Sequence, residues 1–328
     1  MKPFAYERAA TVEDAIALAA DGGVYLAGGT NLVDHLRLGV READRLVDIS
    51  RLPLAEVRER EDGGLVIGAG VRNSDLAAHP LVRTRYPFVT QALVAGASGQ
   101  LRNMATTGGN LLQRTRCVYF QDLTTPCNKR EPGTGCSAVE GLGRHNALIG
   151  ASDDCVAVHP SDLCVPLAAL DAEVVVAGRS GERRIAFADL HRLPGDRPDL
   201  DTTLEPGELV LAVELPPLPM ATRSRYRKVR ERASYAFALV SVAAALDVED
   251  GVVRDVRLAL GGVSHKPHRA LVAEAALRGE PATEVAYRSA IEAELEAARP
   301  GRDNAFKVPL VRNTVVDTLA RLAEGSAA

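Results

Sequence analysis

The sequence of 328 residues has no tryptophan, and aromatic residues make up only 4% of it. A core of ordinary size must therefore be built mainly from Ala, Val and Leu. No apolar run approaches the roughly 20 residues that span a bilayer, and the opening MKPFAYERAA has no apolar signal region. We therefore expect a protein without a membrane span that is cytoplasmic by default.

An excess of positive charge is also absent. The 39 Lys and Arg residues are outnumbered by 43 Asp and Glu residues, which gives a net charge of −4. Such a chain has no general attraction for nucleic acid. Its hydrophobic fraction of 46% and charged fraction of 25% are typical of globular proteins.

Cysteine is missing from all but one window of the chain. The five cysteines are Cys117, Cys127, Cys136, Cys155 and Cys164. Disulfide-stabilised secreted proteins are usually small, so a cluster of reduced thiols points instead to a metal site. None of the five forms CxxC, so zinc-ribbon and ferredoxin spacings both fail. Spacing alone indicates a metal only weakly.

The remaining pattern predicts a mixed α/β chain in three parts. Residues 1–55 read as a small α/β unit, in which Thr11 is the expected N-cap of a helix over 11–20. Residues 56–220 form a second part, interrupted by an insertion at about 114–157 that is rich in Gly and Cys. A proline-rich linker near 216–222 precedes the third part, 223–325, with two strands and two closing helices, roughly over 281–298 and 307–324.

Two glycine turns share one pattern. The first is AGGTN (27–31), and the second is TTGGNLL (106–112). Glycine permits positive φ and close approach to a ligand, so successive N–H groups can converge on an anion. Neither turn matches GxGxxG or the GxxxxGK[ST] phosphate loop. Plain turns and a shared phosphate cradle both stay open on the residues alone.

Three ordered motifs give the chain a family resemblance. LAGGTNLVDHLRLGV, LRNMATTGGNLLQRTRC and HPSDLCVPLAALDAEV together resemble the FAD-binding medium subunit of the molybdenum hydroxylases, the xanthine dehydrogenase and carbon monoxide dehydrogenase family. The resemblance implies a two-part FAD-binding domain of the PCMH type. A small α+β C-terminal domain of the CO dehydrogenase flavoprotein type would follow it.

The resemblance also implies a set of FAD contacts. The two glycine turns would hold the pyrophosphate, and HPSD would lie near the adenosine half. The residues carried over are Ala27, Gly28, Gly29, Thr30, Asn31, Leu32, Thr106, Gly108, Gly109, Asn110, Ser161 and Asp162. One departure is Thr107, where the family usually has an aliphatic residue, which puts the packing behind the second turn in doubt.

The basic run RSRYRKVRERASYAF (223–237) has three interpretations. One is an exposed charged strand edge. A nucleic-acid patch is disfavoured, because the run is short and the chain is acidic. The resemblance instead places Lys228 at the flavin end of the site. A cation there would stabilise the anionic reduced flavin and raise its potential.

The cysteine window resembles the branch of the family that includes periplasmic aldehyde oxidoreductases. That branch carries a [4Fe–4S] cluster in its FAD subunit, which implies Cys117, Cys127, Cys136 and Cys155 as ligands. Cys164 lies in an apolar helix start and is expected to be a small buried residue. Cations near the window would offset the thiolate charge or form a face for a partner.

The implied role is electron transfer within a heterotrimer. A large molybdopterin-binding subunit would hydroxylate an aldehyde or N-heterocycle, and a small subunit with two [2Fe–2S] clusters would pass electrons to this chain. The acceptor would be ferredoxin, a quinone, oxygen or NAD. Some relatives leave the cytoplasm with a signal-bearing small subunit, so a periplasmic location is the alternative. A stand-alone FAD-dependent reductase and a non-catalytic zinc-binding scaffold are the alternative functions.

Overall fold

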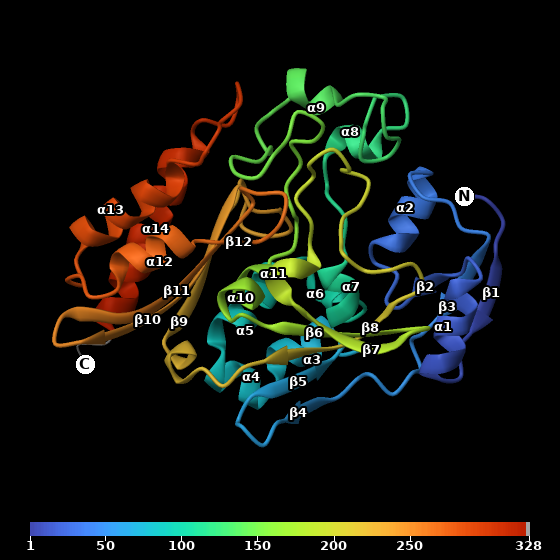
Figure 1. Ribbon diagram of the computed structural model, residues 1–328, viewed down its shortest axis with the longest axis horizontal. Helices are drawn as coiled ribbons and strands as arrows, with labels where there is room; N and C mark the ends of the chain where they lie inside the picture. Colours follow the sequence, from blue (N-terminus) through green and yellow to red (C-terminus); the bar gives the residue numbers. More distant parts are fainter. Residues whose placement is uncertain (326–328) are drawn as a thin grey trace.

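Three β-sheets follow one another in the computed structural model, which describes residues 1–325 (Figure 1). The first sheet is parallel, with strand order β1-β3-β2. Its elements are β1 (Ala5–Arg8), α1 (Val12–Ala20), β2 (Val24–Leu26), α2 (Leu32–Leu38) and β3 (Arg45–Asp48). The Thr11 hydroxyl accepts a hydrogen bond from the Asp14 amide at 3.1 Å, so the predicted N-cap is confirmed.

The second sheet is antiparallel, with strand order β4-β5-β8-β6-β7. Its strands are β4 (Val57–Glu59), β5 (Leu65–Gly68), β6 (Glu173–Gly178), β7 (Gly181–Ala186) and β8 (Leu209–Leu215). The helices of this part are α3 (Asn73–Ala78), α4 (Pro80–Arg85), α5 (Pro87–Ala95), α6 (Gly99–Arg102), α7 (Thr107–Leu111), α10 (Cys164–Ala169) and α11 (Phe187–Leu190).

The insertion between α7 and α10 has little regular structure. Its helices are α8 (Val118–Gln121) and α9 (Ser137–Glu140), each a single turn. In Figure 1 this green segment stands above the sheets, between the first sheet and the C-terminal helices. A segment of this length with so few elements has to be held by side-chain contacts or by a ligand.

The third sheet, β12-β11-β10-β9, is antiparallel. Its elements are η1 (Pro219–Thr222), β9 (Ser224–Val229), β10 (Val240–Glu249), β11 (Val252–Gly261), β12 (His268–Arg269), α12 (Leu271–Leu277), α13 (Glu284–Leu295) and α14 (Lys307–Glu324). Asp250 and Gly251 both have positive φ, 53° and 75°, which is the two-residue turn that joins long hairpin strands. Helices α12 and α14 contact one face of the sheet, and α5 and α10 contact its strands from the second part.

The largest apolar cluster crosses the proline-rich stretch that the sequence predicts as a linker. It joins Leu65 and Val213 of the second sheet to Tyr226 and Ala243 of the third. Ala221, within η1, is fully buried in the same cluster. The second and third parts therefore share one core.

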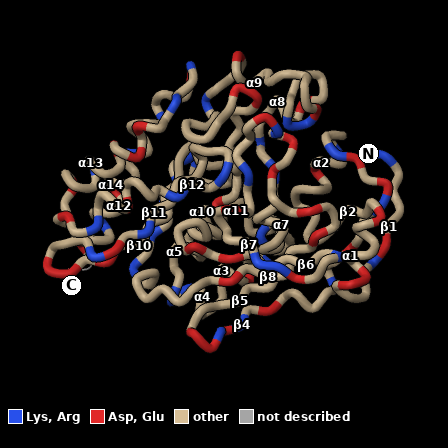
Figure 2. Tube along the Cα trace, in the orientation of Figure 1, with Lys and Arg blue, Asp and Glu red and all other residues tan. Residues whose placement is uncertain are grey.

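The charge distribution agrees with the composition. Lys and Arg are interspersed with Asp and Glu along the trace (Figure 2). Within residues 1–325, the helices are all too short or too polar to cross a membrane.

Candidate cofactor sites

The first glycine turn connects β2 to α2 and leaves its backbone donors free. In the described chain, the amide N–H groups of residues 28–32 have no acceptor within hydrogen-bond distance. Gly29 has φ +72°, a conformation that other residues adopt rarely. The carbonyls of Gly29 and Asn31 already accept bonds from the first turn of α2. Consecutive free N–H groups at a turn into a helix form a binding site for an anion.

The second glycine turn differs from the expected cradle because its N–H groups are already used. The amides of Thr107 and Gly108 donate to Val71 and Ala69 at 2.9 Å. The Gly109 amide donates to the hydroxyl of its own N-cap, Thr106, at 3.3 Å. This turn therefore offers a surface without a Cβ at Gly109, while the first turn offers the free donors.

The two turns touch through glycine. A Cβ on Gly28 would lie only 1.9 Å from the carbonyl oxygen of Met104, just before the second turn. A Cβ on Gly108 would lie 3.0 Å from that of Ala69, at the end of β5. Gly28 thus allows two segments far apart in sequence to meet, and Gly108 allows α7 to pack against the sheet.

Thr107 fits the position where an aliphatic residue was expected. Its side chain is buried, and its hydroxyl donates to the Val71 carbonyl at 3.1 Å. The buried polar atom is satisfied, so the packing behind the turn is intact.

Two cavities meet at the glycine turns. One, of about 280 Å³, is lined by the first turn, Arg41, Arg114 and part of the second sheet. The other, of about 770 Å³, is lined by Asn110, Asp162, Lys228 and the segment before β10. Thr30 and Gly109 line both. A ligand with a phosphate at its middle and a ring system at each end fits this arrangement.

Cations without a full complement of carboxylates surround these cavities. Arg41, beside the smaller cavity, and the half-buried Arg116, beside the larger, make no ion pair in the described chain. Desolvation and the charge of Arg114 lower the pKa of Arg41. Partly desolvated cations that repel each other favour the binding of an anion between them.

Asp162 and Lys228 lie side by side. Their side chains form a buried ion pair with an Nζ–Oδ2 distance of 2.8 Å. The Tyr226 hydroxyl donates to the other carboxylate oxygen at 2.5 Å. Burial and the Asp162 charge raise the pKa of Tyr226, so it remains a neutral donor. Both residues line the larger cavity, and their assignment to the adenosine half and to the flavin end of the cofactor stays a prediction.

Ser161 supports the second turn. Its hydroxyl lies 2.6 Å from Asn110 Oδ1, to which it donates, and it accepts the amide of Cys164 at 3.1 Å. Gln113 also donates to Asn110 Oδ1, at 2.7 Å. The HPSD segment therefore fixes the Asn110 side chain at the wall of the larger cavity.

Four of the five cysteines line one small cavity in the insertion. They are Cys117, Cys127, Cys136 and Cys155, and none is in a disulfide. Cys127 and Cys136 are paired through an isolated antiparallel bridge. Asn128 accepts the amides of Gly133 and Gly135 at 3.1 and 2.7 Å and donates to Asp154 at 3.0 Å. This side chain ties the Cys127–Cys136 loop to the neighbour of Cys155.

The protonation of these thiols depends on what they bind. Burial raises the pKa of Cys155 to about 12, a rise that the charge of Lys129 opposes, and burial also raises the pKa of Cys117. Thiols of this kind ionise when a metal replaces the proton. Within residues 1–325, no three of the four sulfurs lie within 4.8 Å of one another.

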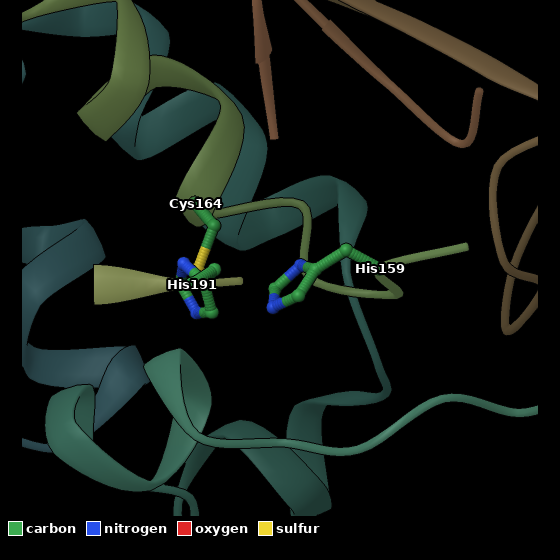
Figure 3. A group of neighbouring side chains, drawn as sticks. All are labelled: His159, Cys164 and His191. Carbon is green, nitrogen blue, oxygen red and sulfur yellow. The ribbon is translucent and has the colours of Figure 1, made fainter. Parts of the chain in front are cut away.

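Cys164 lies apart from that cavity, next to His159 and His191 (Figure 3). The ligand atoms of the three lie within 4.8 Å. His159 Nδ1 accepts the Ser161 amide at 3.3 Å, which places the proton of the neutral ring on Nε2. His191 Nε2 donates to the Leu111 carbonyl at 2.9 Å. His191 thereby supports the end of α7, while the buried His159 Nε2 and His191 Nδ1 have no hydrogen-bond partner within the described residues.

Several residues at these sites carried no sequence signal as ligands. His35 and Arg41 line the smaller cavity, and Tyr235 and Phe237 line the larger one. They come from a helix, a turn and an irregular segment without a recognisable motif. Burial and nearby arginines lower the pKa of His35 to about 4, so it is neutral beside the first glycine turn. A tertiary structure was needed to find them.

Comparison with known proteins agrees with this geometry. A family model described as the FAD binding domain in molybdopterin dehydrogenase matches residues 2–218, and the CO dehydrogenase flavoprotein C-terminal domain matches residues 224–322. The chain is 48% identical to the aldehyde oxidoreductase FAD-binding subunit PaoB of Escherichia coli (strain K12), over 98% of each chain. It is 29% identical to the glyceraldehyde dehydrogenase medium chain of Sulfolobus acidocaldarius, covering 83% of this chain and 79% of the relative.

Solved structures share the fold over nearly the whole chain. Quinoline 2-oxidoreductase from Pseudomonas putida 86 superposes with a TM-score of 0.77 at 23% identity, covering 100% of both chains. Carbon monoxide dehydrogenase from Hydrogenophaga pseudoflava gives 0.75 at 25% identity and covers 97% of both. Together with the two domain matches, these likenesses show that the chain belongs to the FAD-binding flavoprotein subunits of the molybdopterin dehydrogenase family.

Proposed function

We propose that this chain is the electron-transfer subunit of a molybdenum-dependent aldehyde oxidoreductase and carries both FAD and a [4Fe–4S] cluster. The similarity to an aldehyde oxidoreductase subunit over 98% of each chain supports the substrate class. The convergence of Cys117, Cys127, Cys136 and Cys155 on one cavity carries the cluster assignment.

The proposed FAD pose follows from the donors that the chain leaves free. The N–H groups of residues 28–32 hold the pyrophosphate, with Arg41 and Arg114 offsetting its charge. The adenosine half occupies the smaller cavity, and the isoalloxazine ring occupies the larger one. When bound, FAD supplies a centre that accepts two electrons and returns them singly or in pairs. Lys228 places a positive charge in the flavin cavity and is fixed there by Asp162.

The proposed cluster ligands match a cubane in number and placement. Four thiolates are the usual complement of a [4Fe–4S] cluster, and the four thiols here line one cavity. Lys129 lines the cavity, and Asn128 holds the Cys127–Cys136 loop to Asp154. Arg116 lines the larger cavity, proposed for the flavin, and the next residue, Cys117, lines the cysteine cavity. The two proposed cofactor sites therefore meet at these neighbouring residues.

The proposal includes partner subunits. A large molybdopterin-binding subunit performs the hydroxylation, and a small subunit with two [2Fe–2S] clusters delivers the electrons. Ferredoxin, a quinone, oxygen or NAD takes them up. The cytoplasm is the expected compartment, and co-export with a signal-bearing small subunit is the alternative that cell fractionation would identify.

Metal and flavin analysis tests the cofactors. Anaerobically prepared protein should contain one FAD and about four irons per chain. Cys136→Ser should lose the iron, whereas Cys164→Ala should retain it, because Cys164 lies outside the cysteine cavity. A colourless preparation that contains zinc would support the scaffold alternative, and loss of iron in both variants would contradict the proposed ligand set.

Acceptor kinetics of the assembled complex test the role of the cluster. If the cluster is the exit to a protein acceptor, Cys136→Ser should abolish ferredoxin reduction and preserve turnover with a dye. A parallel loss of both rates, together with a lower melting temperature, would mean that the cluster only stabilises the insertion. Rapid oxidation of a nicotinamide by the isolated chain would instead favour a stand-alone reductase.

A further inference from the structure

A half-buried carboxylate joins the two proposed cofactor sites. Asp201 accepts from the Lys129 ammonium through one oxygen and from Arg114 Nε at 2.5 Å through the other. Lys129 lines the cysteine cavity, and Arg114 lines the smaller of the two cavities at the glycine turns. The Lys129 side chain is only 1% exposed, and its ammonium also donates to the Pro198 carbonyl at 2.7 Å.

The charges of this group do not balance within the chain. Among residues 1–325, Asp201 is the only carboxylate that pairs with either Lys129 or Arg114, so two cations share one anion. Buried charges are usually compensated. The remaining positive charge is therefore available to an anion at each end, thiolates at Lys129 and a phosphate at Arg114.

Lys129 is the cation best placed to act on the cysteine site. It comes two residues after Cys127 and lines the same cavity as all four thiols. Asp154 also lines that cavity, but it is half-buried whereas the Lys129 side chain is 1% exposed, so water screens the Asp154 charge more strongly than the Lys129 charge. Arg130 points to the carbonyls of Tyr119, Phe120 and Thr125 instead.

We propose that the positive charge of Lys129 raises the reduction potential of the cysteine-held cluster, and that the negative charge of Asp201 weakens this effect. The inference rests on the proposed [4Fe–4S] cluster. Reduction adds one negative charge to an already anionic group, so a nearby cation in a poorly hydrated site favours the reduced form. The neighbouring carboxylate partly cancels that field.

Two substitutions in this one ion pair should shift the potential in opposite directions. Lys129→Met removes the cation and should lower the midpoint potential. Asp201→Asn removes the anion, keeps the shape and should raise it. Lys129→Arg keeps the charge and should stay closer to the wild type than Lys129→Met. Lys307→Met is the matched control, since Lys307 is a fully buried lysine that donates to the carbonyls of Asn146 and Gly262 and does not line the cysteine cavity.

The measurement is an anaerobic potentiometric titration of the whole chain, followed by electron paramagnetic resonance, with iron content determined for each sample. Opposite shifts in Lys129→Met and Asp201→Asn, with the control unmoved, support the proposal. Equal potentials in iron-loaded variants would overturn the role of Lys129 and leave the cluster assignment standing. If Lys129→Met fails to bind iron, the upward shift in Asp201→Asn decides. Wild-type protein without iron would overturn the cluster assignment itself, which separates the two failures.

Discussion

Gly28→Ala should separate the two glycine turns and weaken FAD binding. The added Cβ would lie 1.9 Å from Met104 O and 2.7 Å from Met104 C, whereas real Cβ contacts do not fall below 3.0 Å. The backbones must therefore move apart by about 1.1 Å. The obstacle is main chain on both sides, so no side-chain rotation can relieve it.

The cost follows from this displacement. Overpacking a tight contact costs about 1 to 3 kcal/mol. If only the FAD complex is strained, the whole cost falls on binding, and FAD affinity falls by about 5- to 150-fold. If the strain is carried by the free protein as well, part of the cost appears as a lower free energy of unfolding.

Flavin titration of the apoprotein, together with urea unfolding, measures both terms. Gly99→Ala is the control, because a Cβ added to Gly99 would have no neighbouring atom within 4 Å and Gly99 lines neither cavity. Its helical site should tolerate alanine. A Gly28→Ala protein with wild-type FAD affinity and stability would refute the contact between the turns.

Asp162→Asn should lower the free energy of unfolding by about 3 to 5 kcal/mol, because it leaves the Lys228 ammonium, 4% exposed, without its carboxylate; urea unfolding at neutral pH would show this, and an unchanged midpoint would contradict the buried pair. Thr107→Val should cost no more than about 1 kcal/mol, because the Val71 carbonyl keeps its bond from the residue 107 amide at 2.9 Å; a larger loss in thermal unfolding would show that the hydroxyl is essential. Burial lowers the pKa of His191 to about 4, whereas an unfolded histidine titrates near 6.5. The unfolded chain then binds more protons between these values, so stability should fall by up to about 3 kcal/mol as pH drops from about 6.5 to 4. His191→Gln should have a shallower pH slope in urea unfolding, and an equal slope would exclude this histidine as a cause.

The sequence was sufficient for the elements whose pattern is local. The helix capped by Thr11 and the closing helix over 307–324 are found where the apolar spacing predicts them. Strands β1, β4 and β7 were not anticipated, because all three lie at sheet edges and are largely exposed. A strand without a buried face has no alternating pattern to read.

The site was predictable only in part for a similar reason. Paired glycines and clustered cysteines are recognisable residue patterns, so the turns and the group of four thiols could be predicted from the sequence. The sequence does not show which turn keeps its N–H groups free. In the structure the second turn donates its N–H groups to the carbonyls of Val71 and Ala69, and the first turn finds no acceptors among residues 1–325. Asp162 and Lys228 are 66 positions apart in the sequence, and no sequence motif indicates that the folded chain brings them together.

The apolar cluster that crosses residues 216–222 has a practical consequence for dissecting the protein. A fragment that stops at residue 218 keeps both glycine turns but loses Tyr226, Ala243 and the lysine that neutralises Asp162. It would expose the apolar side chains of this cluster and the unpaired Asp162 carboxylate to solvent. Recombinant work on flavin binding should therefore use the undivided polypeptide, although sequence families divide it at this point.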